Sequence, residues 1–306
     1  WFLNCVSFVI KLFTRNIISF SNDVSMILVD LNQVLISNLM AQTRGQFDEL
    51  PDKDMLRHMV LNSLRGYNLK FKQEYGTAIL CADGADPWRR DIFPNYKFKR
   101  KQNREESSID WNALFTMIGE IRDEIAKNFP YIVLHIDKVE ADDIIAVLVK
   151  ENHDKEKIMI ISGDKDFIQL HKYPNVKQYA PIQKKFIESD DPKNFLHEQV
   201  IKGDRSDGIP NILSADDVFV TGTKQRPINK KRLEEWANID TIPLGSETKK
   251  YYERNKKLID LDEIPGHIYN DINSKYKNYK VNDRTLLLTY FIENKLKTLI
   301  ENINDF

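Results

Sequence analysis

Four short hydrophobic runs divide the first half of the chain. None of them alternates with polar positions, which is the pattern of strands that are buried on both faces of a sheet. Each run is also bounded by segments of a different, helical periodicity. The runs cover Met26 to Leu31, Thr77 to Ala82, Tyr131 to Ile136 and Lys157 to Ser162. We therefore expect four strands of one sheet.

The segments between these runs have hydrophobic residues at spacings of three and four, which indicates amphipathic helices. Ile118, Ile121 and Ile125 are one example. The expected helices cover Asp54 to Leu69, Ser108 to Phe129 and Ala141 to Asn152. Strands that alternate with helices are typical of a doubly wound α/β fold with a mainly parallel sheet and right-handed crossovers.

After about residue 195 the hydrophobic pattern changes, and helical segments dominate. The clearest of them are Lys230 to Ala237, Lys249 to Ile259 and Arg284 to Ile303. We therefore predict an α/β core over residues 26–194 and a mostly helical C-terminal region over residues 195–306.

Residues 1–25 are hydrophobic enough to look like a signal sequence. Lys11 and Arg15 interrupt the apolar stretch, however, well short of the length that spans a membrane. We expect an N-terminal extension outside the fold, because Met26 directly precedes the first strand. The alternative is an amphipathic helix that packs on the protein body or on a membrane surface.

The composition is that of a globular protein, with 42% hydrophobic and 30% charged residues among 306. A net charge of only -1 argues, by itself, against a nucleic-acid-binding surface. If many acids are gathered at a metal site, however, bound cations neutralise them and the remaining surface is more basic than the total implies. The two cysteines, Cys5 and Cys81, form neither a disulfide framework nor a CxxC pair, which fits a reducing compartment.

Each expected strand runs into an acidic residue: Asp30, Asp83, Asp137 and Asp164 follow the four runs in order. The carboxyl ends of parallel strands lie at one edge of a sheet, so these side chains are expected to converge there. Further acids follow closely in the segments KVEADD, GDKD and GDRSD. They are Glu140, Asp142, Asp143, Asp166, Asp204 and Asp207.

So many carboxylates in one crevice would repel one another unless cations lie among them. Oxygen ligands without histidine or cysteine favour Mg²⁺, with Mn²⁺ as a substitute, over zinc. Two such ions roughly 3.5 to 4 Å apart can clamp a phosphodiester for hydrolysis. For any single aspartate a helix cap is the alternative, and we expect Asp137 and Asp143 to be structural.

Residues 88–106 form a basic segment between the second strand and the following helix. Its cations alternate with aromatic residues, a mixture that can grip a nucleic-acid strand by its phosphates and its unpaired bases. The alternative is a charged surface loop that its aromatic residues pin to the protein body. The cations are Arg89, Arg90, Lys97, Lys99, Arg100, Lys101 and Arg104, and the aromatics are Trp88, Phe93, Tyr96 and Phe98.

Six segments in order, ILVDLN, CADGADPWRRD, YKFKR, KVEADDIIAV, ISGDKDF and KGDRSDGIP, resemble the 5′ nuclease superfamily of flap endonucleases and 5′-3′ exonucleases, including phage ribonucleases H. The resemblance implies a PIN-like α/β core and a C-terminal region with a helix-hairpin-helix-type element that binds the duplex. It also implies a Mg²⁺-dependent nuclease that removes RNA primers and adjacent DNA during lagging-strand replication and cuts flaps.

The resemblance also implies roles for individual residues. Asp30, Asp83, Glu140 and Asp142 correspond to ligands of one metal ion, and Asp164, Asp166, Asp204 and Asp207 to ligands of the other. Lys97 and Arg100 correspond to the bridge residues that touch the scissile phosphate. The expected nucleic-acid contacts are Arg89, Arg90, Tyr96, Lys97, Arg100, Lys101, Arg104, Lys224, Lys230 and Lys231.

The sequence departs from the superfamily after GDRSDGIP. Many relatives have a glycine-rich GxGxKxA hairpin there, whereas this chain reads NILSADDVFVTGTKQRPINKK. Lys224, Lys230 and Lys231, with Arg226 and Arg232, are therefore expected to bind the duplex without that hairpin.

The implied substrates are RNA–DNA hybrids and nicked, flap or forked DNA. The implied partners are a single-stranded DNA-binding protein and a sliding clamp, for a monomer in the cytoplasm of a host cell. Two alternatives stay open. A PIN-like ribonuclease shares the sheet and the acids but lacks a second acid pair like that of GDRSDGIP. The second alternative is a protein that binds DNA junctions without catalysis. The acid set argues against it, because negative charge close to phosphate does not help binding.

Overall fold

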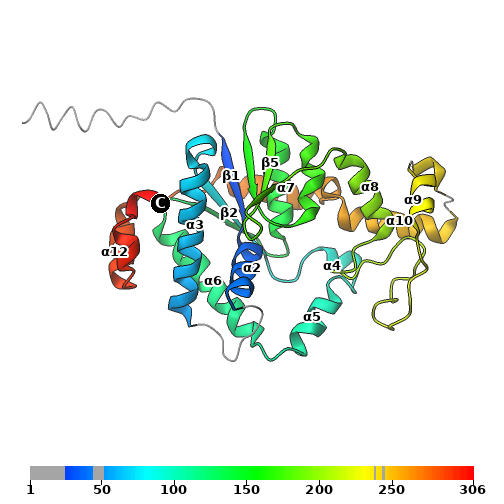
Figure 1. Cartoon of the computed structure of the whole chain (residues 1–306), viewed down its shortest axis with the longest axis horizontal. Coiled ribbons are helices and arrows are strands. Elements are labelled where there is room, and N and C mark those ends of the chain that lie inside the picture. The colour runs from blue at the N-terminus through cyan, green and yellow to red at the C-terminus, as the bar shows by residue number, and fades with distance from the viewer. Residues whose placement is uncertain (1–24, 44–51, 238, 243–244) are drawn as a thin grey trace, which may run out of the picture.

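The computed structural model describes residues 25–43, 52–237, 239–242 and 245–306 (Figure 1). The expected N-terminal extension therefore lies, apart from its last residue, outside the described part of the chain. Among the described helices, none is long and apolar enough to cross a membrane.

A six-stranded sheet forms the centre of the molecule, in the order β3-β2-β1-β4-β5-β6. The first five strands are parallel, and β6 pairs antiparallel with β5. The strands are β1 (Met26–Asp30), β2 (Ala78–Ala82), β3 (Ile132–His135), β4 (Ile158–Ile161), β5 (Val176–Ala180) and β6 (Lys185–Ile187). The four expected strands and the doubly wound fold class are confirmed.

The order of the strands reverses direction at β1, which is the first strand in sequence and lies inside the sheet. The chain moves outward from β1 to β2 and β3, and then returns to the other side of β1 as β4. The carboxyl ends of β1 and β4 therefore border the switch point, where ligands bind in sheets of this kind.

Helices cover both faces of the sheet. Ile27 and Val29 of β1 belong to a core with helices α2 (Leu31–Thr43), α3 (Lys53–Tyr75) and α6 (Trp111–Asn128). Met26 and Leu28 face the opposite core, with α7 (Ala141–Asn152) and α11 (Gly266–Lys277). Because successive side chains of a strand point to opposite faces, a strand buried on both sides needs a continuous apolar sequence.

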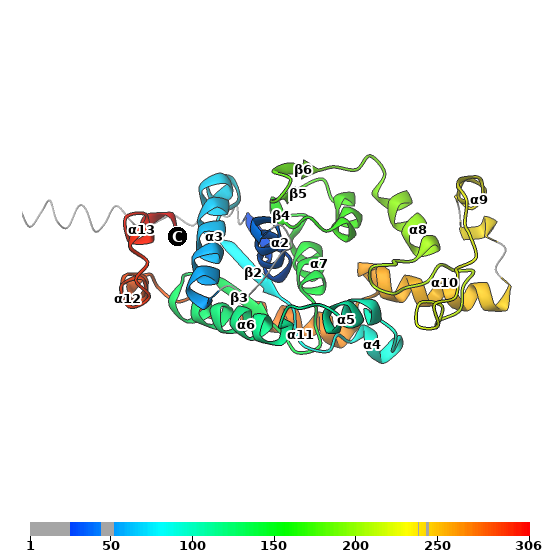
Figure 2. The ribbon, with the colours of Figure 1, turned by 60° about the horizontal axis from the view of Figure 1, so that its bottom comes forward.

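Most of the remaining helices lie at the two ends of the molecule (Figure 2). A third hydrophobic cluster joins the basic segment, through Phe93 and Tyr96, to the helices at one end. Those helices are α8 (Pro192–Lys202), α9 (Lys230–Glu235) and α10 (Ser246–Ile259). The basic segment itself contains α4 (Arg89–Ile92) and α5 (Phe98–Glu105). At the other end of the molecule lie α12 (Thr285–Glu293) and α13 (Lys297–Ile300). The short 3₁₀ helices are η1 (Lys165–Lys172), η2 (Ile239–Thr241), η3 (Leu261–Glu263) and η4 (Ile303–Asp305).

The C-terminal region differs from the expectation in two respects. The single helix expected over Arg284 to Ile303 is broken after Glu293, where Lys295 has φ of +56° and the chain turns before α13. The last third of the chain also returns to the sheet, since Ile268 of α11 and Phe291 of α12 belong to its two cores. The boundary at residue 195 stays a prediction. The helix-hairpin-helix element also stays a prediction, because residues 203–229, where it was expected, form turns around one isolated bridge.

Candidate active site

Three of the predicted acids lie at the carboxyl edge of the sheet. Asp30 ends β1, Asp83 directly follows β2, and Asp164 follows β4 and caps η1. Asp30 is buried, and its carboxylate accepts hydrogen bonds from the Gln33 amide and the Ser162 hydroxyl, both at 3.1 Å. The strand pairing alone therefore brings acids that are far apart in sequence to one edge.

The N-terminus of α7 adds acids to the same edge. Glu140 is its N-cap residue and forms a capping box with Asp143, while Asp142 lies in the first turn. The amide of Ala141 donates to Asp83 Oδ1 at 2.9 Å, which ties α7 to the end of β2. Exposed amides and the helix dipole make this end of a helix favourable for carboxylates.

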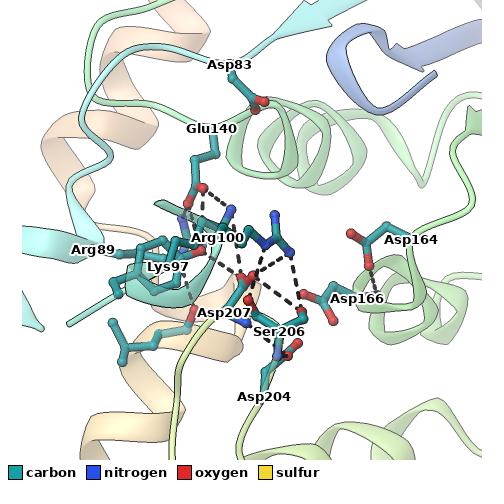
Figure 3. Close-up of polar contacts among 12 residues, drawn as sticks. Asp83, Arg89, Lys97, Arg100, Glu140, Asp164, Asp166, Asp204, Ser206 and Asp207 are labelled. Atoms are coloured by element: carbon teal, nitrogen blue, oxygen red, sulfur yellow. Dashed lines mark hydrogen bonds and ion pairs between the residues drawn. The ribbon is translucent and has the colours of Figure 1, made fainter. Parts of the chain in front are cut away.

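A second group of acids lies beside the first (Figure 3). In the described part of the chain, Asp166, Asp204 and Asp207 have carboxylate oxygens within 4.8 Å of one another, as a metal site requires. Asp204 Oδ1 accepts the amides of Ser206 and Asp207 at 2.7 and 3.2 Å, which folds the turn after α8. Gly203 is needed for this turn, because its φ is +69° and a Cβ would lie 2.3 Å from the Ile209 carbonyl oxygen.

The acids are held against a strong electrostatic penalty. Burial, followed by the charge of Asp83, raises the pKa of Asp30 to about 8. Burial and the neighbouring Asp164 raise the pKa of Asp166 to about 7 and lift the pKa of Asp142 well above its ordinary value. Such carboxylates are poised to take up cations, and their oxygen-only donor set fits Mg²⁺.

We expect the metal-free protein to lose stability as the pH rises from about 7 to about 9. The pKa of Asp30 is raised to about 8, so the folded chain holds more protons than the unfolded chain in this window, and stability falls with pH. Thermal melting in EDTA should give a lower midpoint at pH 9, and Mg²⁺ should reduce the drop. The Asp30→Asn variant should show a shallower pH dependence in EDTA. An unchanged or higher midpoint of the native chain at pH 9 would contradict this reading.

Two cations of the basic segment point into the acids (Figure 3). Lys97 Nζ lies 2.5 Å from Glu140 Oε1, and Arg100 Nη2 lies 2.5 Å from Asp207 Oδ1. The Lys97 backbone is left-handed, with φ of +58°, and its amide donates to the Asp207 carbonyl at 2.7 Å. Burial would raise the pKa of Glu140, but Lys97 and Arg89 outweigh it and lower that pKa to about 2. The cations are thus fixed at the centre of the acidic site.

Arg89 is buried, with only 3% of its surface exposed. Its guanidinium donates to Glu140 at 2.8 Å, to both oxygens of Asp143 and to the Leu258 carbonyl. The predicted contact with a nucleic-acid phosphate does not fit this burial. Tyr96 is also buried, and its hydroxyl lies 3.1 Å from Glu140 Oε2 and 3.0 Å from Asp207 Oδ2, so its one proton is available to either carboxylate. Both residues instead hold the carboxylates in place.

The other predicted nucleic-acid contacts lie at the surface. Arg90 pairs with Asp86, and Lys101 lies 3.9 Å from Glu105 on the same helix. The three lysines that were predicted to bind the duplex in the C-terminal region are exposed and lie outside the acid cluster, on α9 and on the loop before it. They are Lys224, Lys230 and Lys231.

Some residues of the site were not predicted. Gln199 Nε2 donates to Asp166 Oδ1 at 2.5 Å, and Ser162 and Gln33 bond to Asp30 as described above. Gln33 and Ser162 lie within three residues of a predicted acid, and this proximity could have marked them. Gln199 lies on α8, far in sequence from Asp166, and no sequence signal marks it.

The comparison with known proteins agrees with this geometry. The family model described as the N-terminal, resolvase-like domain of 5′-3′ exonucleases matches residues 26–200. The chain belongs to the 5′-3′ exonuclease family. A second model, for the C-terminal part of T4 RNase H, matches residues 193–306. The resemblance inferred from the six sequence segments is thereby confirmed.

Individual relatives extend this result. The chain is 37% identical to the ribonuclease H of Enterobacteria phage T4 over 298 residues, which cover 91% of this chain and 95% of that protein. It is 30% identical to a 5′-3′ exonuclease of Mycoplasmopsis pulmonis over 198 residues, 58% of this chain and 62% of the relative. The T5 5′-exonuclease, solved with divalent zinc ions, has the same fold, with a TM-score of 0.60 at 18% identity over 83% of this chain and 98% of the T5 protein.

Proposed function

We propose that this member of the 5′-3′ exonuclease family is a Mg²⁺-dependent 5′-3′ exonuclease and flap endonuclease with ribonuclease H activity. Its role is to remove RNA primers and adjacent DNA during lagging-strand replication. The observation that carries the proposal is the set of acids at the switch point of the sheet, with Lys97 and Arg100 directed into it.

The two groups of acids divide the proposed metal ligands. Asp30, Asp83, Glu140 and Asp142 belong to one ion, and Asp164, Asp166, Asp204 and Asp207 to the other. Asp164 is not part of the close trio, and its charge acts on Asp30 and Asp142 as well as on Asp166. We therefore place Asp164 on the side of the second group that faces the first. When bound, two Mg²⁺ ions, or Mn²⁺ in their place, supply Lewis-acid polarisation of the phosphate and activation of the attacking water.

Lys97 and Arg100 are the proposed contacts of the scissile phosphate. Both now neutralise carboxylates, and both are on the side of the site that the basic segment forms. When Glu140 and Asp207 have other cations as counter-charges, Lys97 Nζ and the Arg100 guanidinium are free to turn to phosphate oxygens. The charge that develops on those oxygens during cleavage is then stabilised by two cations that are already positioned.

Replacing Lys97 with alanine is expected to lower kcat by about 100-fold, as for the loss of one pre-positioned charged donor, with a smaller change in KM. The measurement is cleavage of a 5′-flap substrate over a range of substrate concentrations. Lys99→Ala is the matched control, because Lys99 Nζ lies over the Phe219 ring and contacts no acid of the site. Equal activity of the Lys97 variant and the native chain would exclude the proposed contact.

A substrate panel tests the proposed function against its alternatives. The purified chain is incubated with Mg²⁺ and an RNA–DNA hybrid, a nicked duplex, 5′-flap and forked DNA, and single-stranded RNA. The proposal predicts short products from the 5′ ends of the hybrid and the nicked strand, and cleavage near the base of the flap. Cutting of single-stranded RNA alone would indicate a PIN-like ribonuclease, and binding without products would indicate a junction-binding protein.

We also propose, from the resemblance to phage ribonucleases H, that the monomer works in the host cytoplasm with a single-stranded DNA-binding protein and a sliding clamp. Exposed Leu288 and Ile292 on α12 offer apolar contacts away from the acids. Co-sedimentation with each partner tests this proposal. A complex that persists unchanged when both residues are replaced by serine would place the contact elsewhere.

A further inference from the structure

A cavity of about 830 Å³ extends from the acidic site along the basic segment to the beginning of α6. Asp83, Glu140 and Lys97 line it at the acids, and Trp111 and Phe115 line it on α6. The cavity is therefore longer than the site of phosphate contact requires. Its part on α6 has no acid of the metal groups and needs a separate explanation.

Two half-buried aromatic side chains lie next to each other in this part of the cavity. The Trp111 and Phe115 rings lie 5.9 Å apart with an interplanar angle of 32°. They are four residues apart on α6, so they lie on one face of the helix. Trp111 Nε1 donates to the Ser107 hydroxyl at 2.7 Å, which fixes the orientation of the indole.

Arg104 lies over this aromatic pair. Its guanidinium carbon is 5.4 Å from the Trp111 ring centroid and 4.8 Å from that of Phe115. Among the described residues, no acid forms an ion pair with Arg104, whereas Lys97 and Arg100 are both paired. The Arg104 guanidinium has no acidic partner in the described part of the chain and lies against ring faces. It is therefore available to bind an anion whose planar group can stack on the same rings.

We infer that the Trp111–Phe115 pair and Arg104 form a binding site for an unpaired nucleotide of the 5′ strand. The rings stack on the base, and the Arg104 guanidinium moves to the adjoining phosphate. Such a site accepts every base, because each one has a π-face. The inference deepens the proposed nuclease function and rests on it, since it names the part of the substrate that this cavity takes.

The spacing along α5 places this site next to the cut. Arg100 and Arg104 are one helical turn apart, about 6 Å along the axis. A strand whose scissile phosphate meets Arg100 thus reaches Arg104 within a few nucleotides. Gly119 lines the same cavity, and a Cβ built on it has no atom within 4 Å, so α6 leaves room for a base there.

An abasic scan of the flap tests the inference. A DNA flap of four unpaired nucleotides is prepared in five forms, one intact and four with a single abasic residue at successive positions. Affinities are measured in EDTA for the native chain, Trp111→Ala and Arg104→Gln, and cleavage is measured in Mg²⁺. Phe186→Ala, which removes a half-exposed aromatic on the edge strand β6, is the control.

For the native chain and Phe186→Ala, one abasic position should lower affinity by about 5- to 100-fold, the range of base–aromatic stacking. Trp111→Ala should bind the intact flap more weakly by a similar factor and lose the response to the abasic residue. Arg104→Gln should weaken binding of the intact flap and reduce its salt dependence. A nicked duplex without a flap should bind all these variants equally.

A second variant covers the case in which Trp111→Ala does not fold. Gly119→Leu keeps every contact of the aromatic pair, favours the helix and fills the space next to the rings, so it should abolish the abasic response. A flat scan in the native chain, or the same response in Trp111→Ala or Gly119→Leu, overturns the inference. If the chain cleaves with Mg²⁺ but the scan is flat, only this inference fails, whereas absence of cleavage on every substrate refutes the proposed function itself.

Discussion

Replacing Asp166 with asparagine is expected to lower the Mg²⁺-dependent cleavage rate by about 1,000-fold, equivalent to the several kcal/mol that a bound metal ion contributes to the transition state. Asp166 belongs to the close trio with Asp204 and Asp207, and an amide is a weaker and uncharged ligand. The asparagine Oδ1 can still accept the hydrogen bond from Gln199, so the local structure should persist. The measurement is the single-turnover cleavage of a 5′-flap substrate.

The same substitution should leave DNA binding intact or strengthen it. The trio repels phosphate when no cation is bound, and removal of one negative charge reduces this repulsion. Binding measured in EDTA therefore separates loss of catalysis from loss of fold or affinity. Asp137→Asn is the matched control, because this exposed acid follows β3 but contacts none of the trio. Cleavage by the Asp166 variant at the native rate would refute the metal-site assignment.

Replacing Arg89 with alanine is expected to lower the free energy of unfolding by about 3–5 kcal/mol, the usual consequence of breaking a buried ion pair. The substitution leaves Asp143, which is 0% exposed, and Glu140, which is 5% exposed, without their shared cation. It also removes the hydrogen bond to the Leu258 carbonyl, which joins the basic segment to α10. Urea unfolding at neutral pH measures the change.

Arg89 should also affect the proposed metal site, because it holds one oxygen of Glu140 while Lys97 contacts the other. Arg89→Lys keeps the charge but loses the forked geometry. We expect it to fold, and to need about 10- to 100-fold more Mg²⁺ for half-maximal cleavage, as when a partner of a ligand is lost. For stability, Arg90→Ala is the control, since its exposed pair with Asp86 contributes little. An Arg89→Ala chain as stable as the native one would contradict this role.

Hydrophobic pattern predicted the central strands well because they are buried on both faces. It missed β5 and β6, the last two strands at one edge of the sheet. Exposed Lys177 and Lys185 interrupt the apolar sequence there. It also missed α2, because Leu31 continues the apolar run of β1 although the helix begins there. A continuous run does not reveal where strand becomes helix.

Most acids of the site were predictable because they follow a strand or lie at the beginning of a helix. Asp204 and Asp207 lie in the turn after α8, and only the acid-rich segment GDRSD marked them. Charge alone could not tell which cations face the solvent. Arg89 and Arg90 are neighbours in the sequence, yet only Arg89 is buried, since it meets Asp143, which is 54 positions further along the chain. That contact depends on the packing of α4 against α7, and no local pattern reports it.

The measurement that tests the central claim most directly is the rate of single-turnover cleavage of a 5′-flap by the native chain at increasing Mg²⁺ concentration. We predict no product in EDTA and a rate that rises more steeply than in proportion to Mg²⁺ before it saturates, because two ions are needed. Cleavage at the same rate in EDTA and in Mg²⁺, or no cleavage at any concentration, would contradict the account.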